Sequence, residues 1–149
     1  MTVIIRYEKK NNGTLNMEKN LAMEVKQDIL NRKDIEILID RFYEYVRNDE
    51  VIGYLFNDVA QTNWEAHLPK MYDFWEVILF GTGRFKGNPM MVHKELHDKS
   101  PISEAHFEHW LYLFQKTVDE LFEGANAEDI KYSAANIAKS LMYRVLSMF

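Results

Sequence analysis

The residues best suited to hold a metal ion or a ligand in this chain are its histidines, because the sequence has no cysteine. This absence excludes disulfides, Fe–S clusters, cysteine-ligated zinc, thiolate-ligated haem and cysteine nucleophiles. Any metal or haem iron must therefore be held by His, carboxylate, Tyr or Met. The histidines stand at positions 67, 93, 97, 106 and 109.

His93 is distinguished by its place in the chain. The glycine-containing segments 81–83 and 87–89 precede it, and Ser100 and Pro101 follow it. Only a short helix of about two turns fits between these helix breakers. A short helix behind a glycine-rich loop can present one histidine to a pocket, so we treat His93 as the first candidate ligand. Its position alone is more typical of an ordinary surface histidine.

A zinc site is the next alternative. His93 and His97 are spaced to share one helix face, which is compatible with a pair of zinc ligands. However, Glu95 stands one place later than the metalloprotease motif requires, and no third ligand is evident. His106 and His109 fall on the polar side of a strongly amphipathic segment, which favours surface histidines.

Other common catalytic patterns are missing from the sequence. The Glu-x-x-His pattern of di-iron bundles fails in register at Glu104, and no Ser/His/Asp signature is present. The glycine spacing of the loop 81–89 is not that of a phosphate-binding loop, and no strand precedes it. Paired carboxylates do not stand out either.

Four amphipathic segments would have to position the histidines. Apolar residues recur at helical spacing over about 32–47, 62–80, 103–123 and 127–147. Asn31, Ser103 and Asn126 predict helix starts, and Gly81 and Gly124 predict helix ends. We predict an all-α domain at about residues 29–149, after a loosely ordered tail at 1–28.

The second of these segments has two unusual features. Its apolar residues cover a wide arc, as expected of a helix that faces both a core and a cavity. Pro69 lies in its interior, where proline removes a hydrogen bond and costs about 3 kcal/mol. We therefore expect a kink or an irregular first turn near His67.

Composition limits the classes of partner. The net charge is −5 and the pI is about 5.5, so the chain has no electrostatic footprint for nucleic acid or an anionic membrane. No apolar run approaches the roughly 20 residues that span a bilayer, and the apolar residues 3–5 are too few for a secretory signal. We expect a cytoplasmic protein.

Three possible hydrogen-bond donors lie on or beside the apolar stripes of three different helices. They are Tyr43, His67 and Trp110. Each alone is more typical of a core aromatic whose polar end finds a backbone partner. Together with His93 they make chemical sense, because a haem iron needs one neutral imidazole and a diatomic ligand on its other side is stabilised by donors.

At these residues the sequence resembles the truncated haemoglobins, and group III most closely, over about residues 30–148. The resemblance is carried by six short segments in the same order and spacing: 41–46, 53–57, 64–75, 79–83, 87–93 and 106–114. Group II members lack the distal-helix histidine that this chain has at position 67. The long N-terminal tail and His97 depart from the family pattern, and His97 could contact a haem propionate or be a surface residue.

The resemblance implies a shortened globin fold in which two antiparallel helix pairs sandwich haem b. It places the proximal histidine at His93, which would be the metal ligand, and the distal residues at Tyr43, His67 and Trp110. His67 could gate ligand entry or bind the iron itself. The aromatic residue that packs on the haem falls on Phe56. The expected haem contacts also include Phe42, Met71, Phe74 and Trp75.

The function implied by the resemblance is reversible binding of O2, and also of NO or CO, at an iron held by His93. Donors that hold O2 tightly argue for NO oxidation or peroxide handling over bulk transport. The partners expected are these gases and a reductase that the sequence does not identify, with the chain a monomer or a weak dimer. Two alternatives stay open: a non-haem helical module with an aromatic-lined apolar pocket, and an interaction protein without a small ligand.

Overall fold

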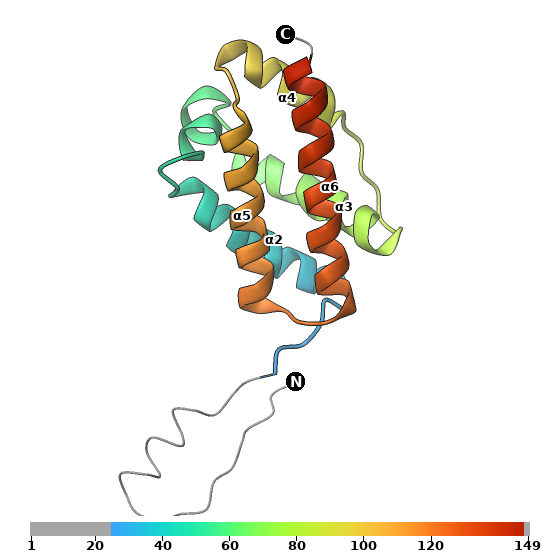
Figure 1. Cartoon of the computed structure of the whole chain (residues 1–149). Coiled ribbons are helices and arrows are strands. Elements are labelled where there is room, and N and C mark those ends of the chain that lie inside the picture. The colour runs from blue at the N-terminus through green and yellow to red at the C-terminus, as the bar shows by residue number, and fades with distance from the viewer. Residues whose placement is uncertain (1–24, 148–149) are drawn as a thin grey trace, which may run out of the picture.

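The computed structural model describes residues 25–147 and contains, over this range, helices and loops but no strand (Figure 1). The predicted all-α class is therefore confirmed. The predicted tail falls largely on residues 1–24, which lie outside the described residues. With the labels of Figure 1, the elements are α2 (Arg32–Arg47), the π-helical turn η1 (Leu55–Val59), α3 (Trp64–Phe80), α4 (Pro89–Lys99), α5 (Glu104–Leu121) and α6 (Ala125–Ser147).

The helices form two packed pairs. α2 packs on α3, α5 packs on α6, and further contacts of α2 with α5 and of α3 with α6 join the pairs. Figure 1 shows α5 and α6 running antiparallel from the short turn that connects them. None of these helices is long and apolar enough to cross a bilayer, within the range that the structure describes.

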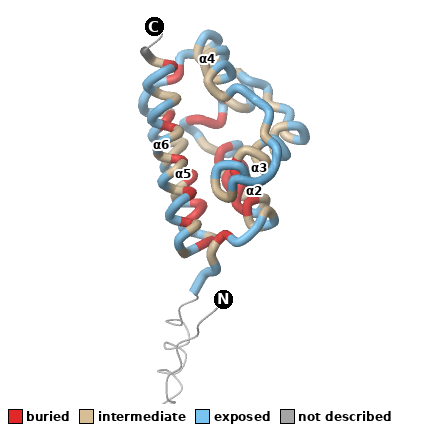
Figure 2. The backbone as a smooth tube through the Cα atoms, turned by 90° about the vertical axis from the view of Figure 1, so that its right-hand side faces the viewer, coloured by how far each residue is buried: buried red, intermediate tan, exposed pale blue. Residues whose placement is uncertain are grey.

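The centre of the core is the apolar stripe of α2. Its members predicted from periodicity are all fully buried: Ile35, Leu38, Ile39, Phe42 and Val46. Figure 2 shows this buried face turned towards α5 and α6. Burial of an aliphatic side chain of this size contributes about 1.5–3 kcal/mol, so this stripe is a main contributor to the stability of the fold.

α4 is the exception, because it contains no buried residue. It packs mainly against α6 and η1, and the ring of His93 also lies 6.5 Å from that of Phe107 in α5. Asn88 caps its first turn by accepting from the backbone N–H of Met91 at 3.1 Å, and Pro89 occupies the first helical position. The helix is eleven residues long, about a turn longer than predicted. Residues of α4 and the buried Trp75 line the same cavity, so the helix leaves space between itself and the core.

The predicted start of α6 is wrong, and the structure gives the reason. The helix begins at Ala125, and Asn126 is not its N-cap. Asp28 takes that part from the other end of the sequence, because its carboxylate accepts from the backbone N–H groups of Asn126 and Ala127 at 2.9 and 2.8 Å. The Asn126 side chain instead donates to the carbonyl of Ile29.

α3 is continuous through Pro69, so the expected irregularity does not interrupt the helix. Its N-cap is Asn63, whose side chain accepts from the N–H of Ala66 at 3.4 Å. Pro69 and Glu65 are both exposed. Water can therefore satisfy the Glu65 carbonyl that loses its helical partner at Pro69.

Candidate haem pocket

The space beside α4 is a cavity of about 490 Å³, a size typical of sites for small molecules and cofactors. Walls from η1, α3, α4, α5 and α6 enclose it, and Tyr43 of α2 closes one end. The cavity is lined by Tyr43, His67, His93 and Trp110, and by Phe56, Met71, Phe74 and Trp75. The structure thus brings together eight of the nine residues predicted for the site.

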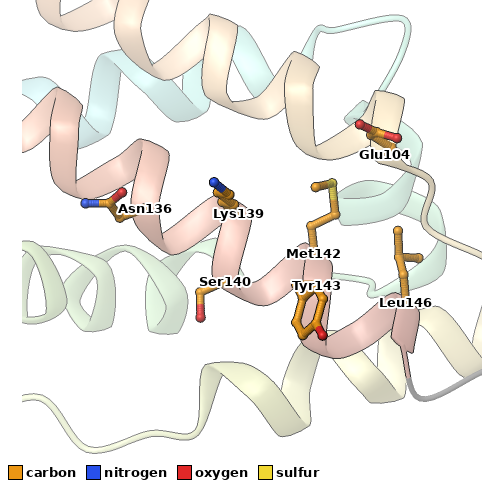
Figure 3. Close-up of a pocket in the computed structure, with 7 residues that line it drawn as sticks. All are labelled: Glu104, Asn136, Lys139, Ser140, Met142, Tyr143 and Leu146. Atoms are coloured by element: carbon orange, nitrogen blue, oxygen red, sulfur yellow. The ribbon is translucent and has the colours of Figure 1, made fainter.

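A second hollow of about 500 Å³ lies on the outer side of α6. Figure 3 shows that its labelled side chains come from α6, apart from Glu104 at the start of α5. It contains no histidine and shares no lining residue with the first cavity. The residues that could do chemistry therefore identify the first cavity as the candidate site.

His93 presents one free ring nitrogen to the cavity. Its Nδ1 lies 2.6 Å from the carbonyl oxygen of Pro89, one turn earlier in α4. A carbonyl can only accept, so Nδ1 carries the proton and Nε2 keeps its lone pair. Burial lowers the pKa of His93 and outweighs the opposite effect of the Pro89 hydrogen bond. The side chain is therefore a neutral imidazole with a fixed tautomer, the form that binds a metal ion.

Among residues 25–147, no group forms a hydrogen bond with the buried Nε2 atom of His67, which belongs to α3. Burial lowers the pKa of this imidazole, and the charge of Lys70 acts in the same direction. A buried polar atom without a partner costs about 1–3 kcal/mol, so such atoms call for a ligand or a functional reason. The atom belongs to a side chain that lines the cavity, where a bound molecule would supply its partner.

Tyr43 and Trp110 reach the cavity from α2 and α5. Tyr43 is 5% exposed, and burial raises the pKa of its phenol, so the hydroxyl keeps its proton and can donate. Its ring centroid lies 5.2 Å from that of His67. The indole of Trp110 is fixed by stacking on Phe114 at 5.5 Å. Two side chains that carry hydrogen-bond donors thus line the same cavity as His67.

Phe42 is the one predicted haem contact that does not line the cavity. It is fully buried, and its ring centroid lies 4.9 Å from that of Tyr43 and 5.6 Å from that of Trp110. Its place is therefore behind the wall, where it supports both donors. Phe42 was expected among the haem contacts from the family resemblance, and helical periodicity does not separate the front of a wall from its support.

Several lining residues were missed from the sequence. The apolar ones include Phe85, Val92, Leu96, Ile137 and Leu141. Ile137 and Leu141 lie in the segment 127–147, where the sequence showed apolar residues at helical spacing but did not indicate which of them face a cavity. Three exposed lysines also line the cavity: Lys70, Lys86 and Lys99. Within the described part of the chain none of them forms an ion pair, so their charges are available to an anionic group.

The other histidines have structural contacts. Nδ1 of His97 accepts from the N–H of Ile102 at 2.8 Å. His106 and His109 are partly exposed, as positions at the surface allow, and each has a specific partner. Nδ1 of His106 accepts from the N–H of Ser103 at 3.0 Å and its ring lines the cavity, while Nε2 of His109 lies 2.8 Å from Asp49. No three metal-ligating side chains gather anywhere among residues 25–147, which removes support from the zinc alternative.

Comparison with known proteins identifies the family of the chain that forms this pocket. The family model described as bacterial-like globin matches residues 27–143. The chain belongs to the bacterial-like globin family. This globin is 30% identical over 126 residues to the group 3 truncated hemoglobin ctb of Campylobacter jejuni. The alignment covers 80% of this chain and 97% of that relative.

Solved structures agree with this assignment. The globin matches the crystal structure of group III truncated hemoglobin from Campylobacter jejuni with a TM-score of 0.71 and 29% identity, over 81% of this chain and 95% of that one. It also matches the crystal structure of the 2/2 hemoglobin from Synechococcus sp. PCC 7002, described with covalently attached heme. This match has a TM-score of 0.64 and 22% identity and covers 78% of this chain and 92% of that one. The predicted membership of group III is confirmed, and the second likeness shows the fold alone.

Proposed function

We propose that this globin binds haem b in the cavity beside α4, with His93 as the proximal ligand, and that it reversibly binds O2, and also NO or CO. The observation that carries the proposal is the pairing of two imidazoles in one cavity. His93 has a free Nε2 lone pair, and His67 has a buried Nε2 without a partner.

The residues of the cavity fit this cofactor. Met71 and Phe74 from α3, with Leu96 and Leu141 from the opposite side, give an apolar lining suited to a porphyrin ring. The unpaired lysines 70, 86 and 99 supply positive charge for the two carboxylates of haem b. When bound, the haem would supply an iron atom that binds diatomic gases.

The three distal side chains would set how long a ligand stays. Tyr43 and Trp110 each carry a donor, and the neutral His67 can donate or accept. A hydrogen bond to a group that carries charge is worth about 1.5–3 kcal/mol, or roughly tenfold to a hundredfold in dissociation rate. Strong retention of this kind favours ligand chemistry, such as NO oxidation or peroxide handling, over bulk transport.

The test is haem uptake followed by absorption spectroscopy. We expect purified protein, or protein mixed with hemin, to show a strong Soret band that shifts when CO is added to the ferrous form. His93→Ala should lose or shift the band. A colourless protein that takes up no added hemin would overturn the proposal and favour a non-haem ligand.

The matched control is His97→Asn. His97 lies on the same helix, one turn later, but does not line the cavity. Asparagine keeps an acceptor for the N–H of Ile102, which His97 now bonds. The Soret band of His97→Asn should equal that of the unmodified chain. Equal loss of the band in both variants would point to a general effect on α4.

A further inference from the structure

The orientation of the His67 ring is controlled by aromatic packing. Its Nε2 makes no hydrogen bond, so no polar contact of that atom fixes the ring. Instead the ring meets Tyr43 at 5.2 Å and 79°, and Trp64 at 5.6 Å and 84°. Edge-to-face contacts of this kind are favourable and directional. The placement of His67 therefore depends on the placement of these two neighbours.

The two neighbours are anchored to different degrees. Tyr43 is buried in the core, whereas Trp64 is partly exposed and is the first residue of α3. The first turn of a helix frays most readily, and the capping bond from Asn63 is long, at 3.4 Å. The indole also stacks on Phe56 at 6.1 Å and packs against Tyr43, with ring centroids 5.2 Å apart.

Arg47 supplies a further contact to Trp64. Its guanidinium carbon lies 4.3 Å from the centroid of the indole. Arg47 forms no ion pair within the part of the chain that the structure describes, so the indole is the partner of its charge. Arg47 is also the last residue of α2, and its carbonyl accepts from the side chain of Asn57 at 2.9 Å. The end of α2 is therefore fixed, and its last side chain tethers the start of α3.

We propose that Arg47 and Trp64 are positioning residues that hold the His67 imidazole in the cavity and thereby slow the entry of ligands. The guanidinium holds the indole, and the indole holds the imidazole. Neither Arg47 nor Trp64 lines the cavity, so both act through His67. The consequence for ligand entry rests on the proposed function, whereas the placement of His67 does not.

The test compares Arg47→Gln with a matched control on the same helix. Arg41→Gln is that control, because Arg41 makes a similar contact with Tyr45, at 4.5 Å, and neither residue lines the cavity. We expect Arg47→Gln to raise the CO association rate of the ferrous protein by about two- to fivefold, the equivalent of an exposed cation–π contact. Arg41→Gln should leave the CO association rate unchanged. Arg47→Lys should give a CO association rate close to that of the unmodified chain.

A double-mutant cycle separates positioning from a general structural effect. In a His67→Leu background, Arg47→Gln should no longer change the CO association rate, because the side chain on which it acts is absent. The CO stretching frequency should shift on Arg47→Gln only when His67 is present. An equal change of rate in both backgrounds would overturn the proposal.

The ring protons of His67 provide a readout that does not require haem. Packed against Trp64, they should show NMR shifts from the ring current of the indole. These shifts should weaken in Arg47→Gln and in Trp64→Leu, and should persist in Arg41→Gln. If the chain takes up no haem, the proposed function fails, while unchanged His67 shifts in Arg47→Gln would overturn the positioning role by themselves.

Discussion

The carboxylate of Asp49 lies 2.8 Å from Nε2 of His109, joining the end of α2 to the middle of α5. The other oxygen of Asp49 accepts from the N–H groups of Val51 and Ile52 at 2.9 and 3.0 Å. Ile52 lines the cavity, and His109 is next to Trp110. This pair therefore holds together two segments that supply walls of the candidate haem pocket.

Acid should weaken the fold through Asp49. Burial alone would raise its pKa, but the hydrogen bonds from His109, Ile52 and Val51 outweigh burial and lower it. The folded protein then binds its proton less readily than the unfolded chain, so this stabilisation is present above about pH 4 and is lost as pH falls through the folded pKa. We expect Asp49→Asn to reduce the free energy of unfolding by about 1 kcal/mol at pH 7.

Urea denaturation at pH 7 and at low pH measures this effect. The difference between Asp49→Asn and the unmodified chain should shrink as Asp49 itself becomes protonated. Glu50→Gln is the control, because the carboxylate of Glu50 is next to Asp49 in the sequence but is exposed and makes no ion pair among the described residues. A pH-independent difference would show that the charge of Asp49 is not what stabilises this corner.

Alkali should weaken the fold through Tyr43. Burial raises the pKa of its phenol, so the folded protein keeps a proton that the unfolded chain releases. This stabilisation is present below about pH 10 and is lost as pH rises above it, by about 1.4 kcal/mol per pH unit. The free energy of unfolding, measured between about pH 8 and pH 11, should fall less steeply in Tyr43→Phe than in the unmodified chain. The exposed Tyr132→Phe should follow the unmodified chain.

Trp110 should slow ligand release. If its N–H donates to the ligand, Trp110→Phe should raise the O2 dissociation rate by about tenfold to a hundredfold, measured by stopped-flow. Tyr112→Phe is the control on the same helix, because Tyr112 is 57% exposed and does not line the cavity. An unchanged O2 dissociation rate in Trp110→Phe would contradict the donor role.

Gly124 should tolerate substitution less well than Gly81. Both have positive φ, at +146° and +69°, but a methyl group at Gly124 would collide with the carboxylate of Asp28, whereas nothing lies near Gly81. Gly81→Ala should cost about 1–2 kcal/mol, the price of the left-handed conformation alone. Gly124→Ala should cost about 1–3 kcal/mol more in thermal or urea unfolding, because it also displaces the cap of α6. Equal losses of unfolding free energy in the two variants would show that the Asp28 side chain can move aside without cost.

The local parts of the fold could be predicted from the sequence. The stripe of α2 was recognised because helical periodicity depends only on neighbouring residues, and all of it is buried. The starts at Asn31 and Ser103 were recognised for the same reason, since a cap acts on the next turn of its own helix. His93 could be singled out because the breakers around it limit the length of its helix.

Tertiary structure decided the features that join distant segments. The cap of α6 comes from Asp28, and the partner of His109 is Asp49, which no local pattern indicates. It also separated Phe42, which supports the wall, from Tyr43, which faces the cavity, although the two are adjacent on one helix. The sequence determined which faces are apolar and which side chains can donate or ligate. Only the packing of the helices determined which of these side chains line the same cavity, because that grouping depends on which helix faces contact each other.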